Sequence, residues 1–380
     1  MEMTLLELDQ KAKYHYSRLE LQEAMMCYAQ AFTEYPNLGL AYNNYGNIMR
    51  ELGYPERAYG FLQTAIDISD EDRIAPFNLS IAYLIAGDLK KGWEQFETRW
   101  RFKNHEHTLN WTTQPRWEGQ DLTDKILLVT CEEGDGDNIQ FIRFVNQLRG
   151  TIIIQTEPQL KKLFKESFKH LVIDNTEPIP HFDYWVPILS LPRILNVTYG
   201  NLISKTPYLK PNKKSINEWK KRMDNGKIRV GVSWRGRTKN YPFEYLFKLM
   251  RENSNYEWVN LQALCTVDEI NQLQSIGVKD YFSNITNWHD TAGLVSNLDV
   301  VITIDTGLAH LVGALNKPCL MLLDRYKTCW RWLLNRNDSP WYPSLTLIRQ
   351  TQIHGYDEQL TNVQNHIAKK IGAEAPISST

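Results

Sequence analysis

The stretch VVITIDTGLAHLVGAL, residues 300–315, decides the fold of the larger part of this 380-residue chain. It begins with an apolar run of strand length that ends at Asp305, and a helix is expected to open at Thr306 and Gly307. The first backbone N–H groups of a helix have no partner within it and lie at the positive end of its dipole. The stretch therefore predicts a buried strand followed by a helix N-terminus that suits a diphosphate.

Strands and helix-length segments alternate on both sides of this stretch. The predicted strands are 125–130, 151–156, 170–174 and 183–188, followed by 227–234, 257–263, 280–285, 300–305 and 318–323. Such alternation is typical of parallel sheets covered by helices. We predict an α/β fold with two Rossmann-like doubly wound domains, 125–212 and 213–371, and a cleft between them. Ligands are expected at the carboxyl ends of strands, in the loops after Thr130, Trp234 and Ile304.

The first hundred residues repeat with a period of 34. Ala24, Ala58 and Gly92 are spaced by 34 residues, as are Gly53 and Gly87. Small residues recur where paired helices must touch, and the period resembles that of the tetratricopeptide family. We predict helical repeats over 1–106 whose concave surface binds a partner; a helical bundle that only caps its neighbour is the alternative.

Two segments have neither helical nor strand periodicity. Residues 107–124 are predicted to form a linker packed by aromatic side chains, and 372–380 a mobile tail. His105 and His107 form an HxH pair, but no cysteine or carboxylate ligand accompanies them, so we assign them no metal.

Composition excludes several classes of protein. The formal net charge is −1, so the overall balance does not favour nucleic acid or an anionic membrane surface. The five cysteines form no CxxC pair, so a disulfide framework or zinc site is not expected. No secretory signal and no apolar run of 18 residues is present in the sequence, and a cytoplasmic location is expected.

The C-terminal half also resembles a known family. Residues 289–323, followed by CWRWLLNRNDSPWYPSLTLIRQ, are similar to bacterial glycosyltransferases related to the lipopolysaccharide heptosyltransferases, in the branch with N-terminal tetratricopeptide repeats. The resemblance extends over 93–350. It implies the two-domain GT-B fold, a nucleotide-activated sugar donor, no metal cofactor, and transfer that inverts the anomeric carbon.

The resemblance assigns the acceptor side to the acidic loop EEGDGDN. The family's Gly-Asp pair falls on Gly136 and Asp137, followed by Asn138, which makes Asp137 the candidate general base. A carboxylate facing the cleft can take the acceptor's proton. Alternatively, Asp137 caps a helix that begins near Asn138. Asp135 is a departure from the family and completes a DGD pattern, which could raise a neighbouring pKa or attract a divalent ion.

The donor side is expected at the ends of three strands. Asp305, Thr306, Gly307 and His310 are predicted to hold the donor, although Asp305 and Thr306 could be ordinary helix caps and His310 a core histidine. Arg235 or Lys239 would assist the leaving diphosphate, and Gln262 would lie near the base; a solvated basic loop and a simple strand end are the alternatives.

The resemblance, together with these residues, implies an inverting glycosyltransferase with a protein acceptor, perhaps flagellin-like, or a glycan acceptor. The competing hypothesis is a catalytically silent repeat scaffold that binds a protein partner. A nucleotide-sugar epimerase is not supported, since no GxGxxG follows the first predicted strand.

Overall fold

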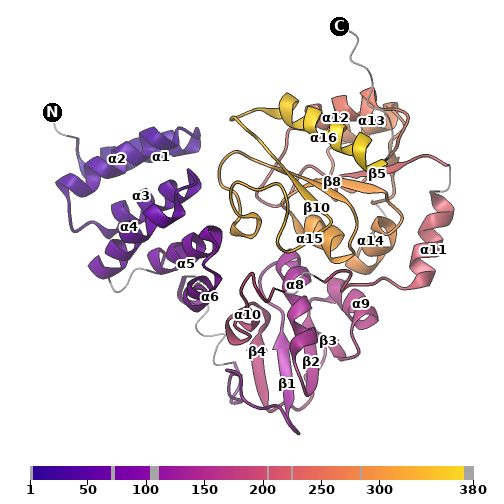
Figure 1. The fold of residues 1–380 in the computed structure, drawn as a ribbon, viewed down its shortest axis with the longest axis horizontal. Helices are drawn as coiled ribbons and strands as arrows, with labels where there is room; N and C mark the ends of the chain where they lie inside the picture. The colour runs from indigo at the N-terminus through magenta and orange to yellow at the C-terminus, as the bar shows by residue number, and fades with distance from the viewer. Residues whose placement is uncertain are drawn as a thin grey trace. The chain divides into compact units, whose positions relative to one another are not determined.

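The computed structural model describes residues 3–69, 73–102, 111–202, 205–223, 226–282 and 285–371 (Figure 1). The chain forms two compact units. Unit 1 comprises Met1–Thr113, Pro192–Leu202 and Tyr326–Asn335, and unit 2 comprises Gln114–Leu191, Ile203–Arg325 and Arg336–Thr380. His105, His107 and the predicted tail 372–380 lie outside the described residues.

Unit 1 contains the predicted helical repeats. Consecutive helices pair into three hairpins, followed by one short helix (Figure 1). The helices are α1 (Leu5–Ser17), α2 (Leu21–Glu34), α3 (Gly39–Glu51), α4 (Pro55–Ile68), α5 (Ala75–Ala86), α6 (Leu89–Phe96) and α7 (Arg99–Phe102). Each hairpin alone would leave an apolar face exposed, so the hairpins stack.

The 34-residue spacing has a physical cause in the helix contacts. Ala24 and Ala58 are fully buried, and a Cβ on Gly92 would lie 2.5 Å from Leu84 Cδ2. Larger side chains at these positions would push the paired helices apart. Gly53 and Gly87, which are also 34 residues apart, lie in the turns between α3 and α4 and between α5 and α6. Both have a positive φ, +95° for Gly53 and +91° for Gly87.

Unit 1 also includes two segments that the sequence assigns to the α/β domains. The Trp93 indole N–H donates to the Val197 carbonyl at 3.0 Å. The same indole packs edge-on against Trp330, in the short 3₁₀ helix Trp330–Trp332, with ring centroids 5.3 Å apart. The last hairpin is therefore covered by chain from 192–202 and 326–335, which sequence periodicity did not indicate.

The first sheet of unit 2 is parallel, with strand order β3-β2-β1-β4. Its strands are β1 (Ile126–Thr130), β2 (Thr151–Thr156), β3 (Leu171–Asp174) and β4 (Tyr184–Pro187), and its main helices are α8 (Asp135–Phe141) and α9 (Pro158–Ser167). Leu128 in the central strand pairs with Ile153 on one side and Trp185 on the other. All four strands lie within one residue of their predicted bounds.

The second sheet of unit 2 is also parallel, with order β10-β9-β8-β5-β6-β7. The strands are β5 (Arg229–Val232), β6 (Glu257–Asn260), β7 (Lys279–Asp280), β8 (Val300–Ile304), β9 (Cys319–Leu323) and β10 (Leu345–Arg349). The helices are α11 (Lys213–Arg222), α12 (Phe243–Glu252), α13 (Val267–Ser275), α14 (Trp288–Val295), α15 (Gly307–Ala314) and α16 (Tyr356–Ile371). The α/β fold with preceding helical repeats is thus confirmed, while the exact domain boundaries stay predictions.

For the second sheet, one strand prediction was wrong and one strand was missed. The strand expected at 280–285 is only two residues long, because the Asp280 carboxylate accepts the Phe282 backbone N–H at 3.1 Å and turns the chain. The sequence analysis also missed β10, which pairs with β9 in register.

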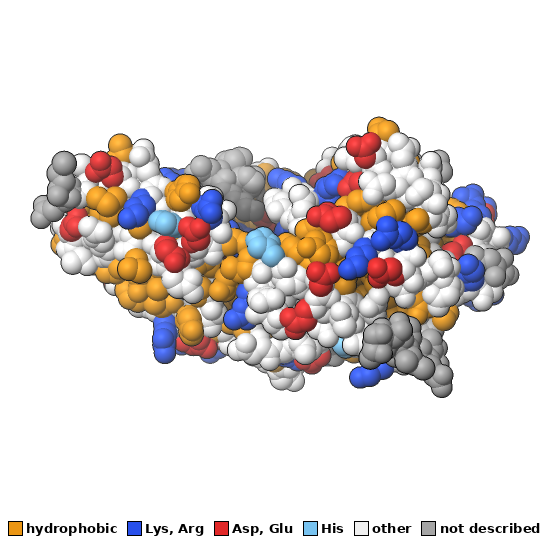
Figure 2. All heavy atoms as spheres, turned by 90° about the horizontal axis from the view of Figure 1, so that it is seen from above, with side chains coloured by type: hydrophobic (Ala, Val, Ile, Leu, Met, Phe, Trp, Pro, Cys, Tyr) orange, Lys and Arg blue, Asp and Glu red, His pale blue; other side chains and the backbone are white. Residues whose placement is uncertain are grey.

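The described surface carries no strong charge of one sign on the face shown in Figure 2, where Lys and Arg side chains are interspersed with Asp and Glu. Within the described ranges, no helix is both long and apolar enough to span a membrane.

Candidate functional site

The N-termini of α8 and α15 meet within unit 2 (Figure 1). Each helix follows the carboxyl end of a central strand, α8 after β1 and α15 after β8. A Cβ added to Gly136 would lie 2.9 Å from the Gly307 Cα and 3.4 Å from its backbone N. Only glycines allow the two backbones to come this close. The positive ends of two helix dipoles therefore converge at one place.

His310 lies at the same junction, one turn inside α15. Its side chain is 5% exposed, and its Nδ1 is 2.9 Å from the Tyr342 hydroxyl. The opposite ring edge faces α8, since Cδ2 lies 3.2 Å from the position of a Cβ on Gly136. His310 is therefore a buried histidine with a polar partner that also borders the junction.

Thr306 and Asp305 connect this junction to the loop after β5. Thr306 is the N-cap residue of α15, but its side chain makes no capping hydrogen bond, so helix capping does not explain it. A Cβ added to Gly236 would lie 2.8 Å from the Thr306 methyl group, so a glycine at this position lets the loop lie close to Thr306. Asp305 forms an ion pair with Lys239 in the same loop. Burial raises the pKa of nearby Asp324, and the charge of Asp305 adds to that rise while Lys239 opposes it.

Arg235 and Gln262 have structural partners. The Gln262 Oε1 atom accepts the backbone N–H groups of Trp234 at 3.1 Å and Arg235 at 2.8 Å, which fixes the end of β5. The Arg235 guanidinium pairs with Glu269 and donates to the Leu264 carbonyl. Burial by itself raises the pKa of Glu269, but hydrogen bonds from Thr266, Arg235 and Trp234 outweigh it and lower the pKa. A role for Arg235 or Gln262 in donor binding stays a prediction.

The acidic loop before α8 is held by its own hydrogen bonds. Glu132 Oε1 accepts the Leu189 N–H at 3.1 Å, and the buried Asn138 side chain accepts the Glu132 N–H at 3.0 Å. Asp137 accepts the Gly134 N–H at 3.2 Å. The predicted helix start near Asn138 was wrong: α8 begins at Asp135, because Gly134 and Asp137 form the capping pair. Asp137 thus both caps α8 and lies next to Gly136.

Asp135, the departure from the family, bridges the two halves of unit 2. Its carboxylate accepts the Trp288 indole N–H at 2.7 Å and the Gln159 amide at 3.0 Å. The Trp288 ring in turn lies against α15, with Cη2 3.0 Å from the position of a Cβ on Gly307. Sequence reasoning missed Trp288, and its only signal was an aromatic residue directly after Asn287, the N-cap of α14.

No cluster of three or more His, Cys, Asp or Glu side chains that could hold a metal ion occurs in the part of the chain that the structure describes. The loop carboxylates Glu132, Asp135 and Asp137 instead accept hydrogen bonds from different donors.

Cys131 precedes this loop, and burial raises the pKa of its thiol to about 12. Because the thiolate is the reactive form, we expect iodoacetamide at pH 8 to alkylate Cys131 about 10³-fold more slowly than an ordinary thiol. Peptide mass mapping after timed labelling measures this rate. The same cysteine should react at the ordinary rate in urea-unfolded protein; labelling of the native protein at that rate would contradict the raised pKa of the thiol.

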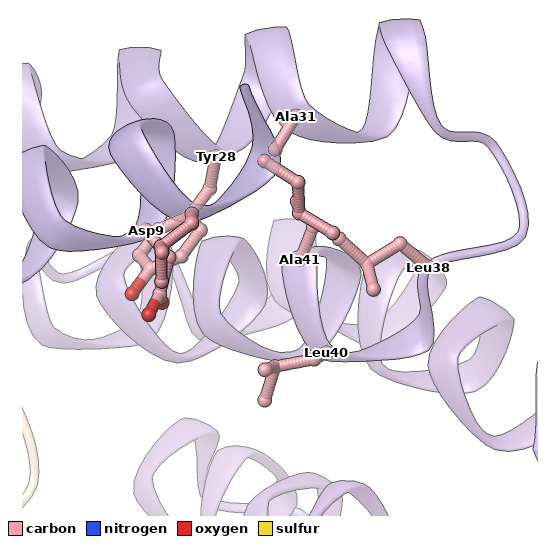
Figure 3. Close-up of a pocket in the computed structure, with 8 residues that line it drawn as sticks. Asp9, Tyr28, Ala31, Leu38, Leu40 and Ala41 are labelled. Atoms are coloured by element: carbon pink, nitrogen blue, oxygen red, sulfur yellow. The ribbon is translucent and has the colours of Figure 1, made fainter. Parts of the chain in front are cut away.

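Unit 1 has a separate cavity of about 380 Å³ between α1, α2 and α3 (Figure 3). Its walls are Leu5, Leu6, Asp9, Tyr28, Ala31, Leu38, Leu40 and Ala41. Figure 3 shows Asp9 and Tyr28 together at one end and Ala31 and Leu38 at the other. Leu6 is 65% and Leu40 48% exposed, so apolar surface is accessible at the rim.

Comparison with known proteins gives distant similarities. No protein-family model matches the chain. It is 24% identical over 348 residues to Protein FlbA of Caulobacter vibrioides, an alignment that covers 82% of this chain and 58% of FlbA. The chain thus spans less than two thirds of the length of this relative.

Solved structures of two kinds are similar to parts of the chain. Unit 2 resembles glycosyl transferase family 9 from Veillonella parvula, with TM-score 0.47, 11% identity, 69% of this chain and 93% of that chain covered. It also resembles ADP-heptose lps heptosyltransferase II from E. coli, with TM-score 0.44, 12% identity, and coverage of 65% and 98%. The helical repeats resemble the TPR2B domain of yeast Sti1, with TM-score 0.27, 14% identity, and coverage of 29% and 87%.

Proposed function

We propose that this chain is an inverting glycosyltransferase that moves a sugar from a nucleotide-diphosphate-sugar donor to an acceptor hydroxyl. One observation carries the proposal: two helix N-termini, one from each parallel sheet, meet at Gly136 and Gly307 beside a carboxylate, Asp137. The solved structures named above include glycosyltransferases, which agrees with the proposal, but at TM-scores below 0.5 they do not carry it.

The donor side of the proposed site is the N-terminus of α15. Its first backbone N–H groups and its dipole favour a diphosphate, and Gly307 allows the phosphate to approach the backbone. His310 borders the same place from inside the helix. Lys239, which is paired with Asp305, would hold the loop after β5 against the ligand. Arg235 or Lys239 would stabilise the charge on the leaving diphosphate.

The acceptor side is α8, with Asp137 as general base. As the acceptor oxygen forms its bond to the anomeric carbon, its proton passes to the Asp137 carboxylate. The bond between the anomeric carbon and the phosphate oxygen breaks, and the nucleoside diphosphate leaves with the bonding electrons. Attack opposite the leaving group inverts the anomeric carbon.

We propose that this reaction needs no divalent metal. Glu132, Asp135 and Asp137 each already accept a hydrogen bond from protein donors, and the helix N-termini provide positive potential for the diphosphate. Chelation by EDTA should therefore leave donor binding unchanged.

The helical repeats are proposed to present a polypeptide acceptor whose apolar side chain enters the cavity beside Leu6 and Leu40. A cavity of about 380 Å³ lies within the range of about 300–1,000 Å³ typical of ligand sites, and its walls are mostly apolar. A protein such as a flagellin subunit is the proposed class of acceptor.

Leu40→Lys tests the role of this cavity. We expect it to lower the transfer of labelled sugar to protein in a lysate of the organism that encodes this chain by about tenfold, because a charge at the rim opposes burial of an apolar side chain. Slow hydrolysis of the donor by water should not change. Met26→Lys is the matched control, since Met26 is 70% exposed and does not line the cavity. Equal labelling by the two variants would contradict the proposed role.

The proposed function as a whole is tested by thermal shift of the full-length protein with nucleoside diphosphates and nucleotide sugars, with and without EDTA. A specific stabilisation that survives EDTA and disappears in Thr306→Trp would support a metal-independent donor site at α15. If no ligand shifts the melting temperature, the catalytically silent scaffold becomes the better explanation.

A further inference from the structure

Asp135 connects three helices through one carboxylate. It is the first residue of α8, and its Oδ2 atom accepts the indole N–H of Trp288, the first residue of α14, at 2.7 Å. Its Oδ1 atom accepts the side-chain amide of Gln159, near the start of α9, at 3.0 Å. Hydrogen bonds to an ionised acceptor are shorter and about twice as strong as those between neutral groups. The carboxylate therefore fixes the start of α8 relative to α9 and α14.

The Trp288 ring continues this connection to α15. Its Cη2 and Cζ2 atoms lie 3.0 Å and 3.3 Å from the position of a Cβ on Gly307, the first residue of α15. The indole is rigid and planar, and its Nε1 atom lies along the same edge as these two carbons. The hydrogen bond to Asp135 therefore also determines where the ring meets Gly307.

The contact between the two glycines does not by itself fix α8 against α15. The Gly136 backbone N is 3.5 Å from the position of a Cβ on Gly307, which is a van der Waals contact. Such a contact limits how closely the two backbones approach, but it does not stop them from sliding past each other. The hydrogen bond of Asp135, one residue before Gly136, has a preferred length and angle. It supplies the direction that the glycine contact lacks.

Asp137 lies in the same first turn of α8 as Asp135. A shift of the start of this helix would therefore move the proposed general base together with Asp135. A general base must lie within hydrogen-bond reach of the proton that it takes, and a displacement of about 1 Å can lower a rate by about 10². The hydrogen bond between Asp135 and Trp288 thus controls a distance on which the proposed reaction depends.

We propose that Asp135 and Trp288 are positioning residues for sugar transfer. The indole is held at its N–H group by Asp135 and packs against Gly307. It thereby sets the distance between Asp137 and the anomeric carbon of a donor bound at the N-terminus of α15. This role rests on the proposed function, and it gives the departure from the family at position 135 a purpose in holding the indole.

The hydrogen bond is tested by ¹H–¹⁵N NMR of the indole groups in the full-length protein, with the Trp288 signal identified by its loss in Trp288→Phe. We expect its proton to lie downfield of that of an exposed indole and to exchange slowly with water. In Asp135→Leu, which has no acceptor at this position, the signal should move upfield and exchange faster. A native signal like that of an exposed indole, or no change in Asp135→Leu, would overturn the proposal.

The positioning role is tested by single-turnover transfer of labelled sugar to protein in a lysate of the organism that encodes this chain. The donor is the nucleotide sugar that gives the largest thermal shift. Asp135→Leu and Trp288→Phe should each lower the rate constant about 30-fold, as expected for a base displaced by somewhat less than 1 Å. Donor affinity should change by less than about threefold. A loss of donor affinity as large as the loss of rate would overturn the positioning role.

Two further variants separate positioning from a loss of folded structure. Asp135→Asn should stay within about threefold of the native rate, because its amide oxygen can still accept the indole N–H. The variant that combines Asp135→Leu with Trp288→Phe should be no slower than either single variant, because both break the same contact. Losses that multiply in the combined variant, or an Asp135→Asn protein as slow as Asp135→Leu, would contradict the role.

Trp117→Phe is the matched control. It also removes an indole N–H from unit 2, one that donates to the Gln120 carbonyl at 2.8 Å. Leu122 in the same segment contacts Gly150, directly before β2, so this segment lies at the amino ends of the strands. We expect the native rate of transfer. A loss as large as in Trp288→Phe would show a general effect of packing and overturn the specific role.

Failure of the proposed function gives a different result from failure of this inference. If the native protein binds no nucleotide sugar and transfers none, the proposed function is wrong and the positioning role with it. If the native protein is active and Asp135→Leu retains its rate, only the positioning role is overturned.

Discussion

Replacing Gly136 by alanine is expected to lower the free energy of unfolding by about 1–3 kcal/mol, the range typical of overpacking, and to abolish transfer. The added Cβ would lie 2.9 Å from the Gly307 Cα; because the backbone of residue 136 fixes the Cβ and the Gly307 Cα is itself backbone, no side chain can turn away to make room. The N-termini of α8 and α15 must move apart. Urea unfolding measures the stability, and the same preparation is assayed for donor binding and transfer.

Gly60→Ala is the control for this substitution. Gly60 lies inside α4, and a Cβ there would meet no atom within 4 Å. Because alanine has the higher helix propensity, we expect this variant to be more stable by about 1 kcal/mol. If Gly136→Ala were as stable as the native protein and fully active, α8 and α15 would not need their close contact.

Asp137→Asn is expected to reduce the rate of transfer by roughly 10² to 10⁴, the usual contribution of a general base. Donor affinity should change little, because Asp137 lies on the acceptor side. The amide oxygen of asparagine can still accept the Gly134 N–H, which Asp137 accepts at 3.2 Å, so the loss of stability should stay below about 1 kcal/mol. Single-turnover kinetics with a saturating donor separates the chemical step from binding.

Asp88→Asn gives the matched control for the capping role. Asp88 is the N-cap of α6 in unit 1 and accepts the Lys91 N–H at 3.1 Å, so this substitution also removes a carboxylate charge that accepts a backbone N–H at a helix N-terminus. We expect a similar small loss of stability and an unchanged rate. If Asp137→Asn retained the native rate, Asp137 would be a helix cap only.

Much of the fold could be predicted because strands buried on both faces form continuous apolar runs. TIIIQT matches β2 at both ends, and VVITID differs from β8 by a single residue. The predictions failed where side-chain hydrogen bonds, or packing against segments distant in the sequence, determine where an element begins or ends. Asp280 ends β7 early through its carboxylate, and α8 begins early because Gly134 and Asp137 cap it.

The candidate site was predictable only in part. Gly136 follows the carboxyl end of β1 in the first sheet, and Gly307 and His310 follow the carboxyl end of β8 in the second, the ends at which such sheets are expected to bind ligands. The bond between Asp135 and Trp288 joins residues 153 positions apart, and such pairs have no local signature.

The central claim is that a nucleoside diphosphate binds where α8 and α15 meet. Hydrogen–deuterium exchange by mass spectrometry tests it directly, with and without the nucleoside diphosphate that gives the largest thermal shift. We predict slower exchange in peptides that contain 305–311 and 134–138, and no such change in Thr306→Trp. Protection confined to other segments, or none with any nucleoside diphosphate at millimolar concentration, would contradict the claim.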